Sequence, residues 1–154
     1  MNVTIIYASE SGNAEMCANS ISDVLRDEFH PQVVDISDMT VDQLRLYDTS
    51  LFVCASYGEG DVPNSALAFF DEISGGGVDL AGVRFAMFGL GDTFYDTYNR
   101  GADRLAEQLR ACGALQFGEH ARHDASSGEP PEEMAEEWAV AVAAQISAEI
   151  QGVA

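Results

Sequence analysis

The sequence predicts a three-layer α/β domain in which helices cover both faces of a five-stranded parallel sheet. Short apolar runs alternate with stretches whose apolar residues recur every three or four positions, which is typical of buried parallel strands and amphipathic helices. A length of 154 residues with 47% hydrophobic residues suits one compact domain. Because the connections between neighbouring parallel strands are almost always right-handed, only a few strand orders are possible for such a sheet. We expect a single doubly wound domain over residues 1–154, with strand order 2-1-3-4-5.

The first half of the chain supplies the first three strands. They are expected over the apolar runs Val3–Ala8, Gln32–Ile36 and Leu51–Ser56. Between the first two, apolar residues from Ala14 to Leu25 fall on one face of a helix. A short helical stretch is expected over Val41–Tyr47. Another helix is expected over Asn64–Ile73, with Pro63 near its start, where a missing N–H does no harm.

The second half supplies the remaining two strands and two helices. After a turn at residues 75–77 we expect a strand over Val83–Phe88, and a weaker one over Ala114–Ala121. The helix between them ends near Gly113, a residue suited to the left-handed conformation at a helix C-terminus. The last helix opens at Pro130-Pro131, and its apolar face carries Ala135, Trp138, Ala139, Val142, Ile146 and Ile150.

The charge balance excludes several classes of partner. The chain has seven arginines, no lysine and 26 acidic residues, which gives a net charge of −19. A surface this acidic repels nucleic acid and anionic lipid, so we expect it to bind neither. Without lysine there is no P-loop. Such a surface would attract partners with a basic face, although simple solubility or adaptation to salt explains the acidity equally well.

The sequence also lacks the patterns of membrane-spanning, secreted, disulfide-linked and metal-binding proteins. No apolar run reaches the ~18–20 residues of a membrane span, and no basic patch precedes the first apolar stretch, so we expect a cytoplasmic protein. The cysteines Cys17, Cys54 and Cys112 are scattered and form no C-x-x-C pair. We interpret them as small buried apolar residues. The three histidines lack metal-ligand spacing, and we predict no metal.

The loop after the first strand has the composition of a phosphate-binding loop. In an open parallel sheet, ligands bind beyond the carboxyl ends of the strands where the strand order reverses, here between strands 1 and 3. Hydroxyls, a glycine and backbone N–H groups that enter a helix can hold a phosphate without a cation. The residues are Ser9, Glu10, Ser11, Gly12, Asn13 and Ala14. An ordinary helix cap made by serine or asparagine is the alternative.

The loops after strands 3 and 4 share a second composition. Both combine glycines, which allow a close approach of the backbone, with aromatic residues and acids. The candidate residues are Ser56, Tyr57, Gly58, Glu59 and Gly60 in one loop, and Gly89, Leu90, Gly91, Tyr95, Tyr98 and Asn99 in the other. One such loop could be a surface turn. Two that flank a phosphate loop predict a slot for a planar aromatic ring with a phosphate tail.

These three segments resemble the flavodoxin family, in its short-chain form. The likeness is greatest to the FMN domains of sulfite reductase and other diflavin reductases. The matching segments are 7–15, 57–61 and 89–91. The resemblance implies FMN as cofactor, with its phosphate on Ser9, Ser11, Gly12, Asn13 and Ala14. It also implies that Tyr57 and Tyr95 sandwich the flavin ring and that Asn99 fixes its loop. A core aromatic is the alternative for Tyr95.

The function implied by the resemblance is electron transfer. We expect a non-enzymatic, monomeric carrier that passes single electrons from an NAD(P)H-dependent reductase, of the flavodoxin/ferredoxin–NADP reductase type, to acceptor enzymes. The first alternative is an FMN-dependent NAD(P)H:quinone oxidoreductase. It needs a cationic nucleotide pocket, for which the candidate loops offer only Arg100. The second alternative is an interaction domain without redox chemistry.

Overall fold

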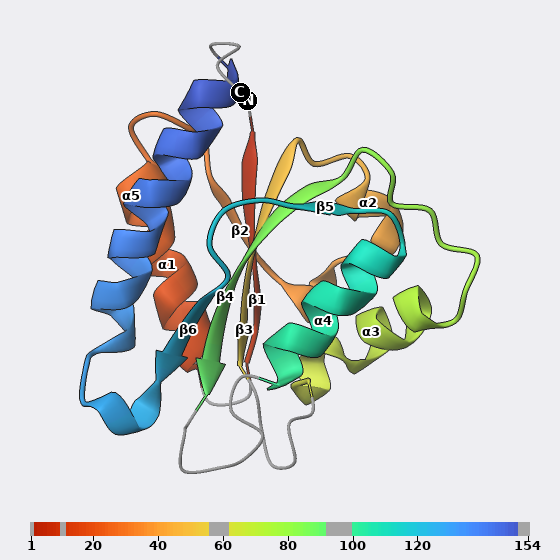
Figure 1. Ribbon diagram of the computed structural model, residues 1–154, viewed down its shortest axis with the longest axis horizontal. Coiled ribbons are helices and arrows are strands. Elements are labelled where there is room, and N and C mark those ends of the chain that lie inside the picture. The colour runs from red at the N-terminus through yellow and green to blue at the C-terminus, as the bar shows by residue number, and fades with distance from the viewer. Residues whose placement is uncertain (1, 10–11, 56–61, 92–99, 151–154) are drawn as a thin grey trace.

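The computed structural model describes residues 2–9, 12–55, 62–91 and 100–150 (Figure 1). All the strands are parallel. Their bounds are β1 Val3–Ala8, β2 Gln32–Asp35, β3 Thr49–Ala55, β4 Arg84–Gly91, β5 Leu115–Gln116 and β6 Ala121–Asp124. The sheet order is β2-β1-β3-β4-β5, and β6 also pairs with β4. The predicted order 2-1-3-4-5 is therefore confirmed.

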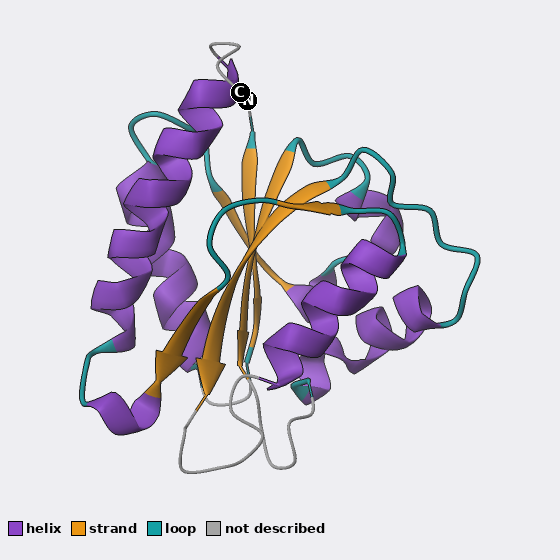
Figure 2. Cartoon of the chain, in the orientation of Figure 1, coloured by secondary structure: helices purple, strands orange, loops and turns teal. Residues whose placement is uncertain are grey.

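Helices cover both faces of the sheet and make three layers (Figure 2). One face carries α1 (Asn13–Leu25) and α5 (Pro131–Ile150), and the other carries α2 (Val41–Leu44), α3 (Leu67–Ser74) and α4 (Arg100–Ala111). Single turns of 3₁₀ helix span Ile36–Asp38, Asn64–Ala66 and Ala125–Ser127. In the described part of the chain, no helix is both long and apolar enough to cross a membrane.

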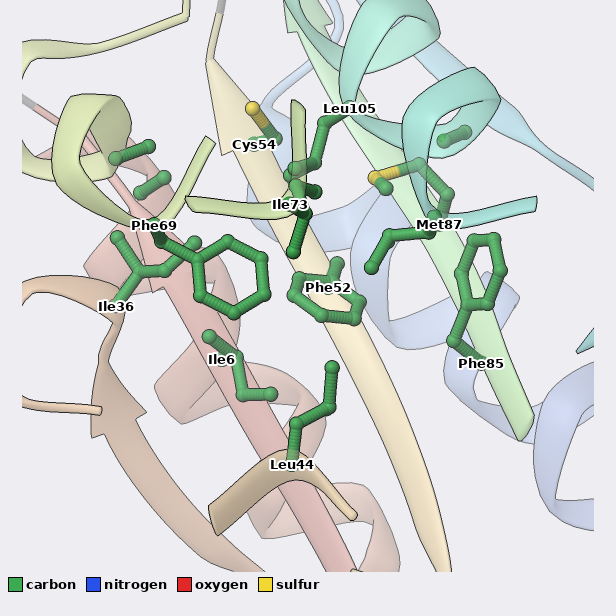
Figure 3. Close-up of a cluster of buried hydrophobic side chains, with 14 of the residues drawn as sticks. Ile6, Ile36, Leu44, Phe52, Cys54, Phe69, Ile73, Phe85, Met87 and Leu105 are labelled. Carbon is green, nitrogen blue, oxygen red and sulfur yellow. The ribbon is translucent and has the colours of Figure 1, made fainter. Parts of the chain in front are cut away.

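Alternate residues of the strands fill two separate cores. Because successive side chains of a strand point to opposite faces, Ile5 packs toward α1 and α5, while Ile6 packs toward α2, α3 and α4. Phe52 occupies the centre of the second core (Figure 3). Its ring centroid lies 6.4 Å from that of Phe69 and 6.0 Å from that of Phe85.

Two of the three cysteines belong to these cores, as predicted. Cys17 and Cys54 are fully buried, and burial raises the pKa of both thiols to about 12. Neither thiol is a thiolate near neutral pH. Cys112 differs because it is only half-buried, and its thiol donates to the carbonyl oxygen of Ile73 at 3.2 Å.

Strand β4 extends further than the sequence predicted. It was expected to end at Phe88, with Gly89, Leu90 and Gly91 in the following loop, but these three residues complete the strand. Gly89 and Leu90 pair with β3 on one side, and all three pair with β6 on the other. Ladder pairing on both sides therefore outweighs the low strand preference of glycine.

The fifth strand is broken, contrary to the prediction of one strand over Ala114–Ala121. Phe85 pairs with Gln116 in β5, and Phe88 pairs with Ala121 in β6. The edge of the sheet thus holds two more residues than β4 between these pairs. Gly118 accommodates them with a φ of +72°, a conformation that other residues rarely adopt.

Side chains from two helices and the fifth strand hold this break in place. The Trp138 indole N–H donates to the Glu119 carbonyl oxygen at 2.9 Å. Arg110 donates to the side-chain oxygen of Gln116 at 3.1 Å, so the amide nitrogen of Gln116, at 3.4 Å, faces His120 Nδ1. That arrangement leaves the proton of the neutral His120 ring on Nε2, which lies 3.4 Å from the Asp103 carboxylate. His120 is therefore a half-buried, neutral member of a polar cluster.

The stability of the protein should fall as the pH is lowered from 6.5 toward 4. Burial, followed by the charge of Arg122, lowers the pKa of His120 to about 4, although the Asp103 carboxylate acts in the opposite direction and Arg110 in the same one. Between these pH values the unfolded chain binds a proton that the folded chain does not. We expect the free energy of unfolding to fall by about 1–2 kcal/mol, a figure that is reduced to account for screening by solvent. Urea unfolding at pH 7 and pH 4.5 measures it.

His120→Gln should remove this part of the pH dependence, whereas His30→Gln, at an exposed histidine, should leave it in place. An identical pH profile for the wild-type protein and His120→Gln would contradict the role given to His120.

Candidate functional site

The carboxyl ends of β1, β3 and β4 lie side by side at one end of the sheet (Figure 1). Ala8 at the end of β1 pairs with Cys54, and Ala55 at the end of β3 pairs with Leu90. β1 stands between β2 and β3, so the chain winds in opposite directions from this point. Open α/β sheets bind their ligands in the crevice at such a reversal.

The loop after β1 leads directly into the N-terminus of α1, at this end of the sheet. Gly12 is the N-cap of α1, with a φ of +90°, and among the described residues no side-chain hydrogen bond caps the helix there. The Gly12 N–H donates to Ser9 Oγ at 3.0 Å, and the Met16 N–H donates to the Gly12 carbonyl oxygen at 3.0 Å. The serine or asparagine cap considered from the sequence is therefore not present at the N-cap. The first-turn amides and the helix dipole favour an anion.

The sequence-predicted residues of this loop have different surroundings. Ser9 is half-buried, whereas Gly12 and Asn13 are exposed. Ala14 is fully buried, and its side chain packs in the core against α5. Ser9 directly follows β1, and Asn13 and Ala14 begin α1. The structure thus brings these four residues together around one helix end.

The other predicted site residues divide into two groups. Gly89 and Leu90 are buried in β4, and Gly91 is its last residue, beside Asp124 at the end of β6. They therefore lie at the correct edge of the sheet, but in a strand. Ten predicted residues fall outside the described part of the chain: Glu10, Ser11, Ser56, Tyr57, Gly58, Glu59, Gly60, Tyr95, Tyr98 and Asn99.

A hydrogen bond that connects the two sides of the loop was not predicted. The Tyr7 hydroxyl, on β1, donates to Glu15 Oε2, in the first turn of α1, at 3.1 Å. Burial raises the pKa of Tyr7 to about 12, with further contributions from the hydrogen bond to Glu15 and from the charges of Asp35, Glu15 and Asp38. The only sequence signal was that both residues belong to the matched segment, and it did not show that they touch.

The end of β6 completes the same edge of the sheet. The Asp124 carboxylate accepts from the Ser126 N–H at 2.9 Å, and the Ser127 hydroxyl donates to the Asp124 carbonyl oxygen at 2.7 Å. The buried His123 ring lies with Nε2 2.6 Å from the Glu129 carbonyl oxygen. These bonds place a structured turn with a half-buried acid beside the end of β4.

These features define a doubly wound α/β protein in which the loop between β1 and α1 lies at the reversal of strand order. The flavodoxin family profile matches residues 5–138. The protein MioC homologue of Haemophilus influenzae is 32% identical over 145 residues, which cover 90% of this chain and 94% of the homologue. Oxidised flavodoxin 1 of Bacillus cereus superposes with a TM-score of 0.79 at 30% identity, over 91% of this chain and 95% of that one.

A larger enzyme shares the same domain. Human NADPH–cytochrome P450 reductase is 36% identical over 128 residues, which cover 76% of this chain but only 19% of the reductase. The chain belongs to the flavodoxin family. The resemblance noted in the sequence is confirmed. The cofactor of this protein is FMN, and the chemistry of this protein is electron transfer.

The described residues fit the cofactor. FMN carries a dianionic phosphate, and the helix end at Gly12 offers amide donors, the Ser9 hydroxyl and a favourable dipole without a cation. This is the donor set expected of a protein that holds a phosphate within a strongly acidic surface.

Proposed function

We propose that the protein is a non-enzymatic, single-domain FMN carrier. It would take single electrons from an NAD(P)H-dependent reductase and deliver them to acceptor enzymes. The observation that supports this most directly is the glycine N-cap of α1, which lies at the reversal of strand order. The match to the MioC homologue over nearly its whole length supports a carrier that works as one domain. A monomer in the cytoplasm is part of the same proposal.

The residues proposed to hold FMN belong to three segments. Ser9 and the backbone amides of Gly12, Asn13 and Ala14 would bind the phosphate, together with Glu10 and Ser11. Two further segments would border the ring: Ser56, Tyr57, Gly58, Glu59 and Gly60, and Gly89, Leu90, Gly91, Tyr95, Tyr98 and Asn99. FMN itself supplies the redox chemistry, and the protein supplies binding, orientation and field.

The acidity of the protein should lower the potential of the bound flavin. Asp35 and Asp124 end β2 and β6 at the cofactor edge of the sheet, and the net charge is −19. One acid about 8 Å from a newly added negative charge costs about 2 kcal/mol at an effective dielectric of about 20, or roughly 90 mV. We expect the lower of the two one-electron potentials to lie below that of free FMN.

A spectroelectrochemical titration of the holoprotein tests this expectation. High salt should raise the potential because it screens exposed acids. A lower potential equal to that of free FMN would contradict the electrostatic argument.

The proposed partners present basic faces to this acidic surface. The 26 acidic residues outnumber the seven arginines, and opposite charges speed the encounter of two proteins at low salt. Relatives in which the domain forms a fifth or less of a longer chain include NADPH–cytochrome P450 reductases. This supports a flavodoxin/ferredoxin–NADP reductase type of donor. None of the relatives reported above is a quinone reductase, and the quinone oxidoreductase alternative is not favoured.

The visible spectrum and a coupled assay test the proposal together. The purified protein should be yellow, and its FMN-free form should bind FMN. With NADPH alone its spectrum should not change, and it should be reduced only when a flavodoxin reductase is added. Rapid NADPH oxidation with a quinone, and without added reductase, would identify an enzyme instead. A colourless protein that ignores added FMN would overturn the proposal altogether.

A further inference from the structure

The hydrogen bond between Tyr7 and Glu15 joins the two ends of the loop that follows β1. Tyr7 lies two residues before Ser9, and Glu15 lies three residues after Gly12. The half-buried Tyr7 ring packs against the core beneath α1, and its hydroxyl reaches the exposed Glu15 carboxylate at 3.1 Å. A second hydrogen bond lies between these two residues in the sequence: the Gly12 N–H donates to Ser9 Oγ and shapes the loop itself. The outer bond ties the first turn of α1 to β1.

Tyr7 remains a hydrogen-bond donor over the whole physiological pH range. Burial and the acids around it raise the pKa of Tyr7 to about 12, so its hydroxyl keeps its proton. The carboxylate of Glu15 accepts a charge-assisted hydrogen bond from this hydroxyl, which is stronger than a neutral one.

The position of the Glu15 carboxylate matters for an anion at the same helix end. Glu15 stands in the first turn of α1, where the helix dipole favours a negative group. A phosphate bound to the amides of Gly12 and Asn13 would use the same favourable field and would be repelled by a nearby carboxylate. The bond to Tyr7 holds this carboxylate against β1, which keeps it from turning over the exposed helix end.

We propose that Tyr7 is a positioning residue for the phosphate of FMN, and that it acts through Glu15. This inference rests on the proposed FMN site. It predicts a particular selectivity, because riboflavin has the same ring as FMN but no phosphate. Loss of the Tyr7 hydroxyl should weaken the binding of FMN and leave the binding of riboflavin unchanged.

The test compares the dissociation constants of FMN and riboflavin, measured by quenching of flavin fluorescence with FMN-free protein. Tyr7→Phe removes one oxygen atom and leaves the ring packed. It should raise the Kd for FMN about threefold to fivefold and change the Kd for riboflavin less than twofold. The control is Tyr47→Phe, at a half-buried tyrosine that packs on the other core. It should change neither constant, and thermal unfolding checks that every variant is folded.

A double-mutant cycle tests whether Tyr7 acts through Glu15. In a Glu15→Ala background, Tyr7→Phe should change the Kd for FMN less than 1.5-fold, because the carboxylate to be positioned is gone. A full effect of Tyr7→Phe in that background would overturn the inference. So would equal losses for FMN and riboflavin, or no loss for either. Wild-type protein that binds no FMN would instead overturn the proposed function itself, and with it this inference.

Discussion

Gly12→Ala should weaken FMN binding about fivefold to thirtyfold. Gly12 has a φ of +90° at the N-cap of α1, and no atom lies within 4 Å of the position that a Cβ would take. The strain is therefore conformational, about 1–2 kcal/mol for a residue that carries a side chain. The chain can relieve it by turning the loop amides away from the crevice. Titration of FMN-free protein with FMN measures the loss.

Gly82→Ala is a closely matched control for this substitution. Gly82 has a φ of +89°, and a Cβ at this residue would also have no neighbouring atom within 4 Å. It precedes β4 at the end of the sheet away from the candidate site. Both variants should lose a similar amount of stability, but only Gly12→Ala should lose FMN. Equal FMN affinities for the two variants would show that the Gly12 conformation is not needed for the site.

Phe52→Ala should lower the free energy of unfolding by about 3–5 kcal/mol. Phe52 is 1% exposed, and its ring contacts Phe69 from α3 and Phe85 from β4. Removing the ring leaves a cavity between the sheet and its helices. Denaturant unfolding at one fixed FMN concentration measures the change, because bound ligand adds to stability.

Phe70→Ala provides the comparison for Phe52. Phe70 is only half-buried, and its ring lies 5.4 Å from the Arg104 guanidinium carbon. Its loss should cost about 1–2 kcal/mol, since less apolar surface leaves the core. If the two variants were equally stable, the central place of Phe52 in this core would be wrong.

The regular elements were predictable because their patterns are local. The apolar run Val3–Ala8 belongs to a strand covered on both faces, and the spacing from Ala14 to Leu25 belongs to a helix with one buried side. The sheet order then followed from the alternation of strands and helices. Two features depended on distant partners. Gly89–Gly91 became strand through pairing with β3 and β6, and the fifth strand broke because its residues outnumber those of β4.

The candidate site could be predicted to the extent that its chemistry is local. The Ser9–Ala14 loop was readable because serine, glycine and a following helix have known preferences. That Gly12, and no serine or asparagine side chain, stands at the N-cap needed the backbone angles. The contact between Tyr7 and Glu15 depends on how α1 lies over β1, a relation that residue types alone do not specify. Residues 10–11, 56–61 and 92–99 lie outside the described chain, so the site residues assigned there stay a prediction.

The division of the outermost strand into β5, with two residues, and β6, with four, has a consequence for behaviour at high concentration. A long, straight border of unpaired backbone groups invites another molecule to extend the sheet and start an aggregate. Here the turn at Gly118 interrupts that border, and β2 at the opposite margin is also only four residues long. Extension of the sheet from either edge should therefore stay unfavourable even in concentrated salt, where mutual repulsion between acidic surfaces has largely disappeared.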